Sequence, residues 1–136
     1  MAERLRPVLD GSFHPKGHSA ETEVILIVMT DGVPSDTNFD GLRQLVQSKV
    51  KNVYVTFLMC TEEDEIVEQY NKYVDNIPNV DITDDYLSER KEVEAHGRKL
   101  SYYKWLAKAV LGGKMPKYDA MDEPAKPQGG GCCTIA

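Results

Sequence analysis

Asp31 is the residue whose surroundings best suit chemistry, because it directly follows a long apolar run. The run extends from Val24 to Met29, and the segment Thr30-Asp31-Gly32-Val33-Pro34 comes next. Glycine and proline in this segment indicate a loop, so Asp31 is expected where a strand ends. In open α/β sheets, ligands bind beyond the carboxyl ends of the strands. Carboxylate oxygens favour hard ions such as Mg²⁺, which makes Asp31 a candidate metal ligand; the alternative is a turn aspartate that bonds backbone amides.

The last residues carry a second group of reactive side chains. Cys133-Thr134-Ile135-Ala136 matches the C-a-a-X prenylation pattern, and alanine at the final position favours farnesyl. Cys132 is a candidate palmitoylation site, which matters because one lipid alone binds membranes only marginally. We therefore expect Cys133 and Cys132 to anchor the chain to a membrane. The alternatives are an unmodified tail and a pair of thiols that bind metal.

Other reactive residues are expected to have ordinary roles. His14, His18 and His96 are expected in loops, since Pro15 and Gly17 argue against a helix that would align the first two. Cys60 is expected to be a buried thiol at a strand end. There is no phosphate-binding glycine loop and no Ser/His/Asp order, so no catalytic residue is assigned and we expect a protein that is not an enzyme.

The composition limits the classes of protein that are possible. The 136 residues suffice for one domain, with 41% hydrophobic and 28% charged residues. A net charge of −6 without a Lys/Arg run argues against a nucleic-acid partner. No run approaches the ~20 apolar residues of a membrane span, and no signal peptide is visible. The three cysteines do not form a disulfide framework, which favours a cytoplasmic protein, associated with the cytoplasmic face of a membrane if the tail is lipidated.

Apolar periodicity predicts alternating strands and helices. Strands are expected at Val24–Thr30, Val53–Met59 and Val80–Thr83, the first two buried on both faces. Helices are expected after Asp36 or Asn38, after Thr61 and after Ser101, whereas 84–97 is either a loop or a solvated helix. Such alternation predicts a Rossmann-like, three-layer α/β/α fold with a parallel sheet. About three strands and three helices make it an incomplete fold.

Three regions follow from this pattern. Residues 1–23 are expected to form a loop or extended arm, residues 24–113 a partial α/β domain, and residues 114–136 a disordered tail rich in proline and glycine.

The segment from Val24 to Gly113 resembles the C-terminal half of von Willebrand factor A-type domains. The resemblance rests on the apolar strand that runs into Thr30-Asp31-Gly32-x-Pro34, on the strand Val53–Met59, and on the segments 80–86 and 102–112. It implies that Asp31 belongs to a metal site, where a partner's carboxylate would complete the metal shell. The family's Asp-x-Ser-x-Ser motif does not occur in this sequence, so the implied site is incomplete.

The resemblance implies a protein-binding module whose metal site is degenerate. A complete domain of this family would place more strands beside Val24–Thr30. We therefore expect a fragment, a chain that pairs with another polypeptide, or an edge rebuilt by residues 1–23, and we favour the fragment. The alternatives for function are a small α/β enzyme that uses Asp31 and a non-functional truncation.

Overall fold

A computed structural model describes residues 1–13 and 21–121. Its centre is a parallel sheet of three strands, β1 (Val24–Thr30), β2 (Val53–Met59) and β3 (Val80–Thr83), in the order β1-β2-β3. Val24 pairs with Val53, and Val55 pairs with Val80. All three strands have the bounds that the apolar runs predict. The sheet is that of an incomplete, Rossmann-like α/β fold.

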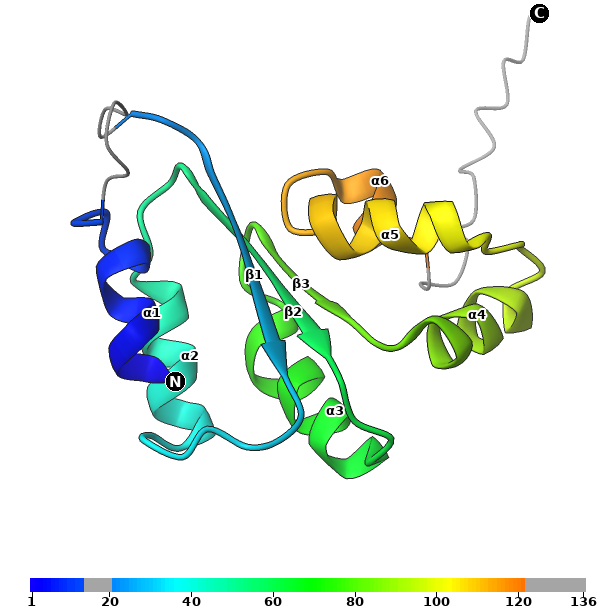
Figure 1. The fold of residues 1–136 in the computed structure, drawn as a ribbon, viewed down its shortest axis with the longest axis horizontal. Coiled ribbons are helices and arrows are strands. Elements are labelled where there is room, and N and C mark those ends of the chain that lie inside the picture. The colour runs from blue at the N-terminus through cyan, green and yellow to red at the C-terminus, as the bar shows by residue number, and fades with distance from the viewer. Residues whose placement is uncertain (14–20, 122–136) are drawn as a thin grey trace, which may run out of the picture.

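Helices cover both faces of the sheet (Figure 1). They are α1 (Ala2–Leu9), α2 (Phe39–Gln47), α3 (Asp64–Tyr70) with its π-helical continuation η1 (Asn71–Asp75), α4 (Tyr86–Ala95), α5 (Tyr102–Leu111) and α6 (Pro116–Asp119). The first three helices and η1 enclose the main core, to which Val55, Phe57 and Tyr70 contribute buried side chains. On the opposite face, α5 packs against the sheet and contacts both α4 and α6.

Helix α1 corrects the expectation of a loop or extended arm over residues 1–23. Ala2, Leu5 and Leu9 recur at helical spacing and are buried, and α1 packs against α2. Asp36, considered above as a cap for α2, caps α1 instead: its carboxylate accepts hydrogen bonds from the amides of Ala2 (2.9 Å) and Glu3 (3.1 Å). The signal was present in the sequence but short, and its cap lies far along the chain.

Helix α4 decides between the two alternatives for residues 84–97, and helix α6 corrects the expectation for the start of the C-terminal region. Residues 84–97 contain α4, which begins because the Asp85 carboxylate accepts hydrogen bonds from the amides of Leu87 and Ser88. The region 114–136 was expected to be disordered, yet it begins with α6, whose first residue is Pro116. Residues 122–136 lie outside the described residues. Asn38 caps α2, as one of the two predicted candidates.

Strand β1 is buried on one face only, which corrects the prediction of burial on both. Ile25, Ile27 and Met29 are 40%, 39% and 68% exposed, whereas Val28 is 8% exposed. All three exposed residues lie on the same face of the sheet as Thr56 of β2. Helix α5 covers that face at β2, where Thr56 is 1% exposed. Six of the seven residues of β1 are apolar, and such a run gives the same sequence pattern whether one face or both faces are buried. The sequence therefore did not distinguish the two cases.

Candidate functional site

The predicted site residue Asp31 lies at the carboxyl end of β1, as the sequence indicates. The amide of Cys60 donates to the carbonyl of Thr30 at 2.7 Å and so aligns the ends of β1 and β2. The carbonyl of Gly32 accepts from the hydroxyls of Thr30 and Tyr70, both at 3.1 Å. These contacts fix the turn, while the Asp31 side chain is exposed.

The structure does not give Asp31 a set of fellow metal ligands. Within 1–13 and 21–121, three acidic, histidine or cysteine side chains come together once, at Asp75, Asp81 and Asp119, whose carboxylates lie within 4.8 Å of one another. Asp31 is not among them. Beside the turn, a shallow pocket of about 350 Å³ is lined by Cys60, Thr61, Glu62 and Asp85. Cys60 is exposed, which corrects the expectation of a buried thiol.

The free edge of β1 is the largest unfinished feature of the sheet. The amide of Val24 donates to Asn52 and the carbonyl of Thr30 accepts from Cys60, so even-numbered residues of β1 bond to β2. In a strand, backbone groups alternate sides, so those of Ile25, Ile27 and Met29 point away from β2. Among the described residues no strand pairs with that side, because β1 is the outer strand of the sheet.

The same three residues therefore offer both backbone hydrogen-bonding groups and apolar side chains to a binding partner. Their backbone groups form one edge of the sheet, and their side chains form an exposed apolar row on its face. Monomeric proteins usually shield such edges with charges, proline or a covering element. In the part of the chain that the structure describes, the row carries no charge and no proline, and no strand pairs with it. We call these three residues the β1 edge row.

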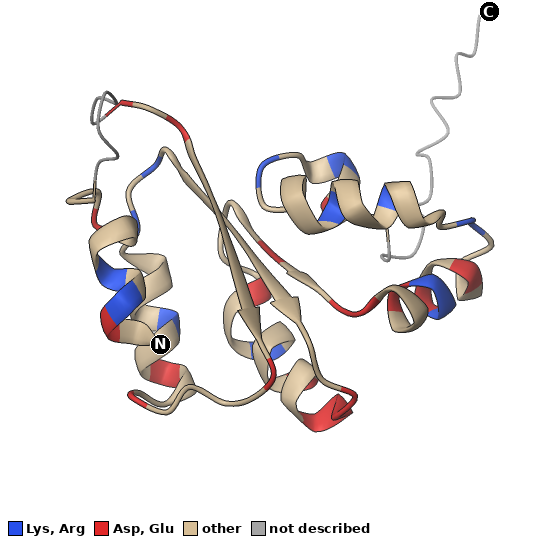
Figure 2. Ribbon diagram, in the orientation of Figure 1, with Lys and Arg blue, Asp and Glu red and all other residues tan. Residues whose placement is uncertain are grey.

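Acidic residues surround the end of the β1 edge row (Figure 2). Asp31 directly follows Met29 and Thr30, and the loop after the neighbouring strand β2 leads into Glu62-Glu63-Asp64-Glu65. The parallel arrangement brings the ends of both strands to the same side of the sheet. Carboxylates gathered at one end of a sheet favour cationic groups there.

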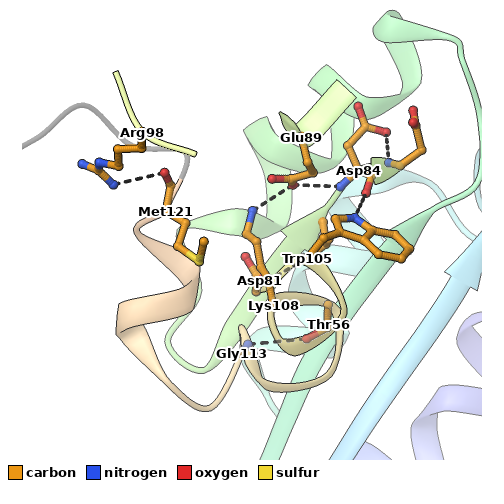
Figure 3. Close-up of polar contacts among 11 residues, drawn as sticks. Thr56, Asp81, Asp84, Glu89, Arg98, Trp105, Lys108, Gly113 and Met121 are labelled. Carbon is orange, nitrogen blue, oxygen red and sulfur yellow. Dashed lines mark hydrogen bonds and ion pairs between the residues drawn. The ribbon is translucent and has the colours of Figure 1, made fainter. Parts of the chain in front are cut away.

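Behind the sheet, α4 and α5 are joined to β3 by buried charges (Figure 3). The Lys108 ammonium lies 2.8 Å from a carboxylate oxygen of Glu89, and the two residues are 0% and 1% exposed. The same oxygen of Glu89 accepts a hydrogen bond from the amide of Asp84 at 3.0 Å. The Trp105 indole donates to the carbonyl of Asp84 at 2.9 Å. The Lys108–Glu89 ion pair and the Trp105 indole thus fix Asp84, in the segment that connects β3 to α4.

Asp81 is a second buried carboxyl beside this pair. It is 1% exposed and accepts a hydrogen bond from the Thr83 hydroxyl at 2.9 Å. Burial raises the pKa of Asp81 to about 8, an effect that Asp119 reinforces and that Lys108 and the Thr83 hydroxyl oppose. Below that pKa this carboxyl is mainly protonated, so it adds little negative charge beside the Lys108–Glu89 ion pair.

Gly112 and Gly113 let the end of α5 approach the sheet. A Cβ atom at Gly113 would lie 2.3 Å from the carbonyl oxygen of Val55, and one at Gly112 would lie 1.7 Å from a carboxylate oxygen of Asp81. The amide of Gly113 donates to the Thr56 hydroxyl at 3.4 Å. The sequence indicated only that this glycine pair ends the helix.

Sequence reasoning missed both members of the buried ion pair. Lys108 lies between Trp105 and Ala109 on the face of α5 that turns inward, and this spacing was its only signal. Of the predicted residues, His96 is exposed at the end of α4, whereas His14, His18, Cys132 and Cys133 lie outside the described residues. Across the described part of the chain, each helix is too short or too polar to cross a membrane.

Comparison of the chain with family models, with curated proteins and with solved structures gave no match.

Proposed function

We propose that this chain is a protein-binding module that receives an extended segment of another protein along the β1 edge row. The observation that supports the proposal is the coincidence of unused backbone groups and exposed apolar side chains at Ile25, Ile27 and Met29. Strand addition uses both: main-chain hydrogen bonds give affinity, and alternate side chains give specificity.

The surroundings of the row define the chemistry of the partner segment. Alternating apolar residues would place one face of the added strand beside the row, as on neighbouring strands of a sheet. Its end next to Asp31 would carry lysine or arginine, because that end of the sheet is acidic. β1 has seven residues, so the segment that pairs with its whole length has about the same number.

This proposal does not require a metal ion. The resemblance to von Willebrand factor A-type domains implies a metal-dependent partner, but the described residues near Asp31 form no ligand set. Hydrogen bonds along an edge and burial of three apolar side chains are sufficient for a module of this kind. In a calorimetric titration with Mg²⁺ we expect no heat of binding. Mg²⁺ should also leave the thermal stability of the protein unchanged.

A peptide selection tests the proposed edge directly. A displayed library of random peptides is selected against the immobilised full chain, and the enriched peptides are measured by calorimetry. We expect the enriched peptides to alternate apolar with other residues and to end in basic residues.

Met29→Lys should weaken the binding of these peptides at least about tenfold, since it places a charge on the contact face. Leu87→Lys is the matched control, because Leu87 on α4 is 63% exposed, close to the 68% of Met29. Enriched peptides that bind Met29→Lys as tightly as the wild type would refute the edge.

The second part of the proposal is a membrane tether at Cys133, with Cys132 as a further lipid site. It rests on the sequence Cys133-Thr134-Ile135-Ala136. Mass spectrometry of the protein isolated from its native cells should find a prenyl group on Cys133 and loss of the last three residues. An unmodified C-terminus that retains Ala136 would contradict the tether.

A further inference from the structure

A pocket with basic walls lies between the end of α4, the start of α5 and α6. Its volume is about 470 Å³, and its lining includes Arg98, Lys99, Lys104 and Lys117 together with Tyr118 and Met121. These are four of the 16 Lys and Arg residues of a chain whose net charge is −6. Among the residues that the structure describes, no aspartate or glutamate lines it. Figure 2 shows basic residues on α5, on α6 and in the loop that precedes α5.

The fold builds this pocket from three separate segments. Arg98 is half-buried, and its guanidinium donates to the carbonyls of Ala120 (2.8 Å) and Met121 (3.1 Å), which ties the loop before α5 to the end of α6 (Figure 3). The two hydrogen bonds hold the walls at a fixed separation. The cavity is therefore formed before any ligand arrives, which lowers the entropy lost on binding.

Two of the three lysines have no charged partner among the described residues. The side chains of Lys99 and Lys104 are exposed and make no hydrogen bond or ion pair within the described residues, and Lys117 lies 4.8 Å from the centre of the Tyr118 ring. Lys104 also lies in the first turn of α5, whose N-terminus adds a partial positive charge. Several cations around one concave surface repel one another, and an anion would relieve that repulsion.

We propose that this pocket binds a phosphate-bearing ligand, of the class of inositol phosphates or the phosphorylated inositol headgroups of lipids. The volume admits a group larger than a single phosphate, and pockets of this size hold small organic ligands. Lysine ammonium groups bind phosphate oxygens through charge-assisted hydrogen bonds. The apolar parts of Tyr118 and Met121 would contact the ring that carries the phosphates.

Titration calorimetry at low salt tests the pocket with three probes. They are inorganic phosphate, inositol trisphosphate and phosphatidylcholine vesicles that contain a small fraction of phosphatidylinositol bisphosphate. The protein is the full chain produced without lipid modification, so that a prenyl group does not contribute to vesicle binding. We expect inositol trisphosphate to bind more tightly than inorganic phosphate, with an affinity that falls as salt rises. Binding to the vesicles would identify the lipid as the source of the headgroup, whereas binding of the trisphosphate alone would identify a soluble ligand.

Two double variants separate the pocket from general charge. Lys99→Gln with Lys104→Gln should weaken binding at least about tenfold, since each lysine supplies a charge-assisted contact. Lys51→Gln with Lys72→Gln removes the same charge outside the pocket lining and should bind as the wild type does. The proposal is wrong if none of the three probes binds, or if both double variants lose affinity equally.

Discussion

At the scale of single residues, the buried charges behind the sheet follow a simple electrostatic rule. Lys108, Glu89 and Asp81 are each at most 1% exposed, and the carboxylates of Asp75 and Asp119 lie within 4.8 Å of that of Asp81. Several carboxyl groups therefore share the surroundings of one buried ammonium. Burying a net charge is unfavourable, and a group in that position neutralises instead. Asp81 is the group that does so, because Glu89 makes the direct ion pair at 2.8 Å.

Replacing Asp81 with asparagine should make the stability of the protein less sensitive to a rise in pH between about 4 and 8. An unfolded aspartate ionises near pH 3.9, whereas the pKa of Asp81 in the folded protein is about 8. Between these values the native state holds a proton that the unfolded state has lost. The contribution of this carboxyl is therefore fully present below about pH 4 and is lost as pH rises toward 8.

Urea unfolding at pH 5 and pH 8 measures this effect. From pH 5 to pH 8, the wild type should lose about 1–3 kcal/mol more of its free energy of unfolding than Asp81→Asn does. Asp31→Asn, which removes a carboxylate at an exposed position, is the control. Equal pH dependence in the wild type and Asp81→Asn would show that Asp81 is ionised in the folded state.

Removal of the buried ammonium should destabilise the fold strongly. Lys108→Met leaves the carboxylate of Glu89 buried without its cation, which typically costs about 3–5 kcal/mol. Adding Glu89→Gln should recover part of that loss, because the remaining side chain is neutral. Lys51→Met, at an exposed position, should change the free energy of unfolding by less than about 0.5 kcal/mol. A loss for Lys108→Met as small as that for Lys51→Met would show that the pair does not hold α5 to α4.

At the scale of elements, the position of α5 depends on backbone-to-backbone approach. Gly113→Ala would place a methyl group 2.3 Å from the carbonyl oxygen of Val55. Because that atom belongs to the backbone of β2, relieving the clash would require α5 or the strand to shift. We expect a loss of about 1–3 kcal/mol, measured by thermal or urea unfolding. Gly32→Ala is the matched control, since a Cβ there meets nothing within 4 Å, and a similar loss in both variants would rule out the close approach as the cause.

The elements also show how far sequence reasoning reached. The three strands were predicted to the residue, because continuous apolar runs bounded by loops leave little choice. Helix α1 was missed because its apolar spacing is brief and its cap, Asp36, is distant in the sequence. Asp31 was placed correctly at its strand end. The Lys108–Glu89 pair and the basic pocket were not found, because each joins residues that only the packing of α4, α5 and α6 brings together.

At the scale of the whole molecule, charge and apolar surface are separated. Acidic residues gather at the carboxyl ends of the strands, basic ones line the pocket beside α5 and α6, and the β1 edge row lies on the outer strand of the sheet. Each surface suits a different ligand: an extended segment with a basic end for the row, and a phosphate-bearing group for the pocket. Because they involve separate residues, the two proposals can be tested independently.

The most direct test of the β1 edge row is photo-cross-linking from its centre. A benzophenone amino acid replaces Ile27 in the full chain, in the cells that express it, and the products are identified by mass spectrometry. The same substitution at the exposed Leu87 of α4 serves as the control. We predict that Ile27 cross-links one partner protein through an extended, apolar segment and that Leu87 does not. Absence of any cross-link from Ile27, or the same set of cross-linked proteins from both positions, would contradict the proposal that this edge binds a partner strand.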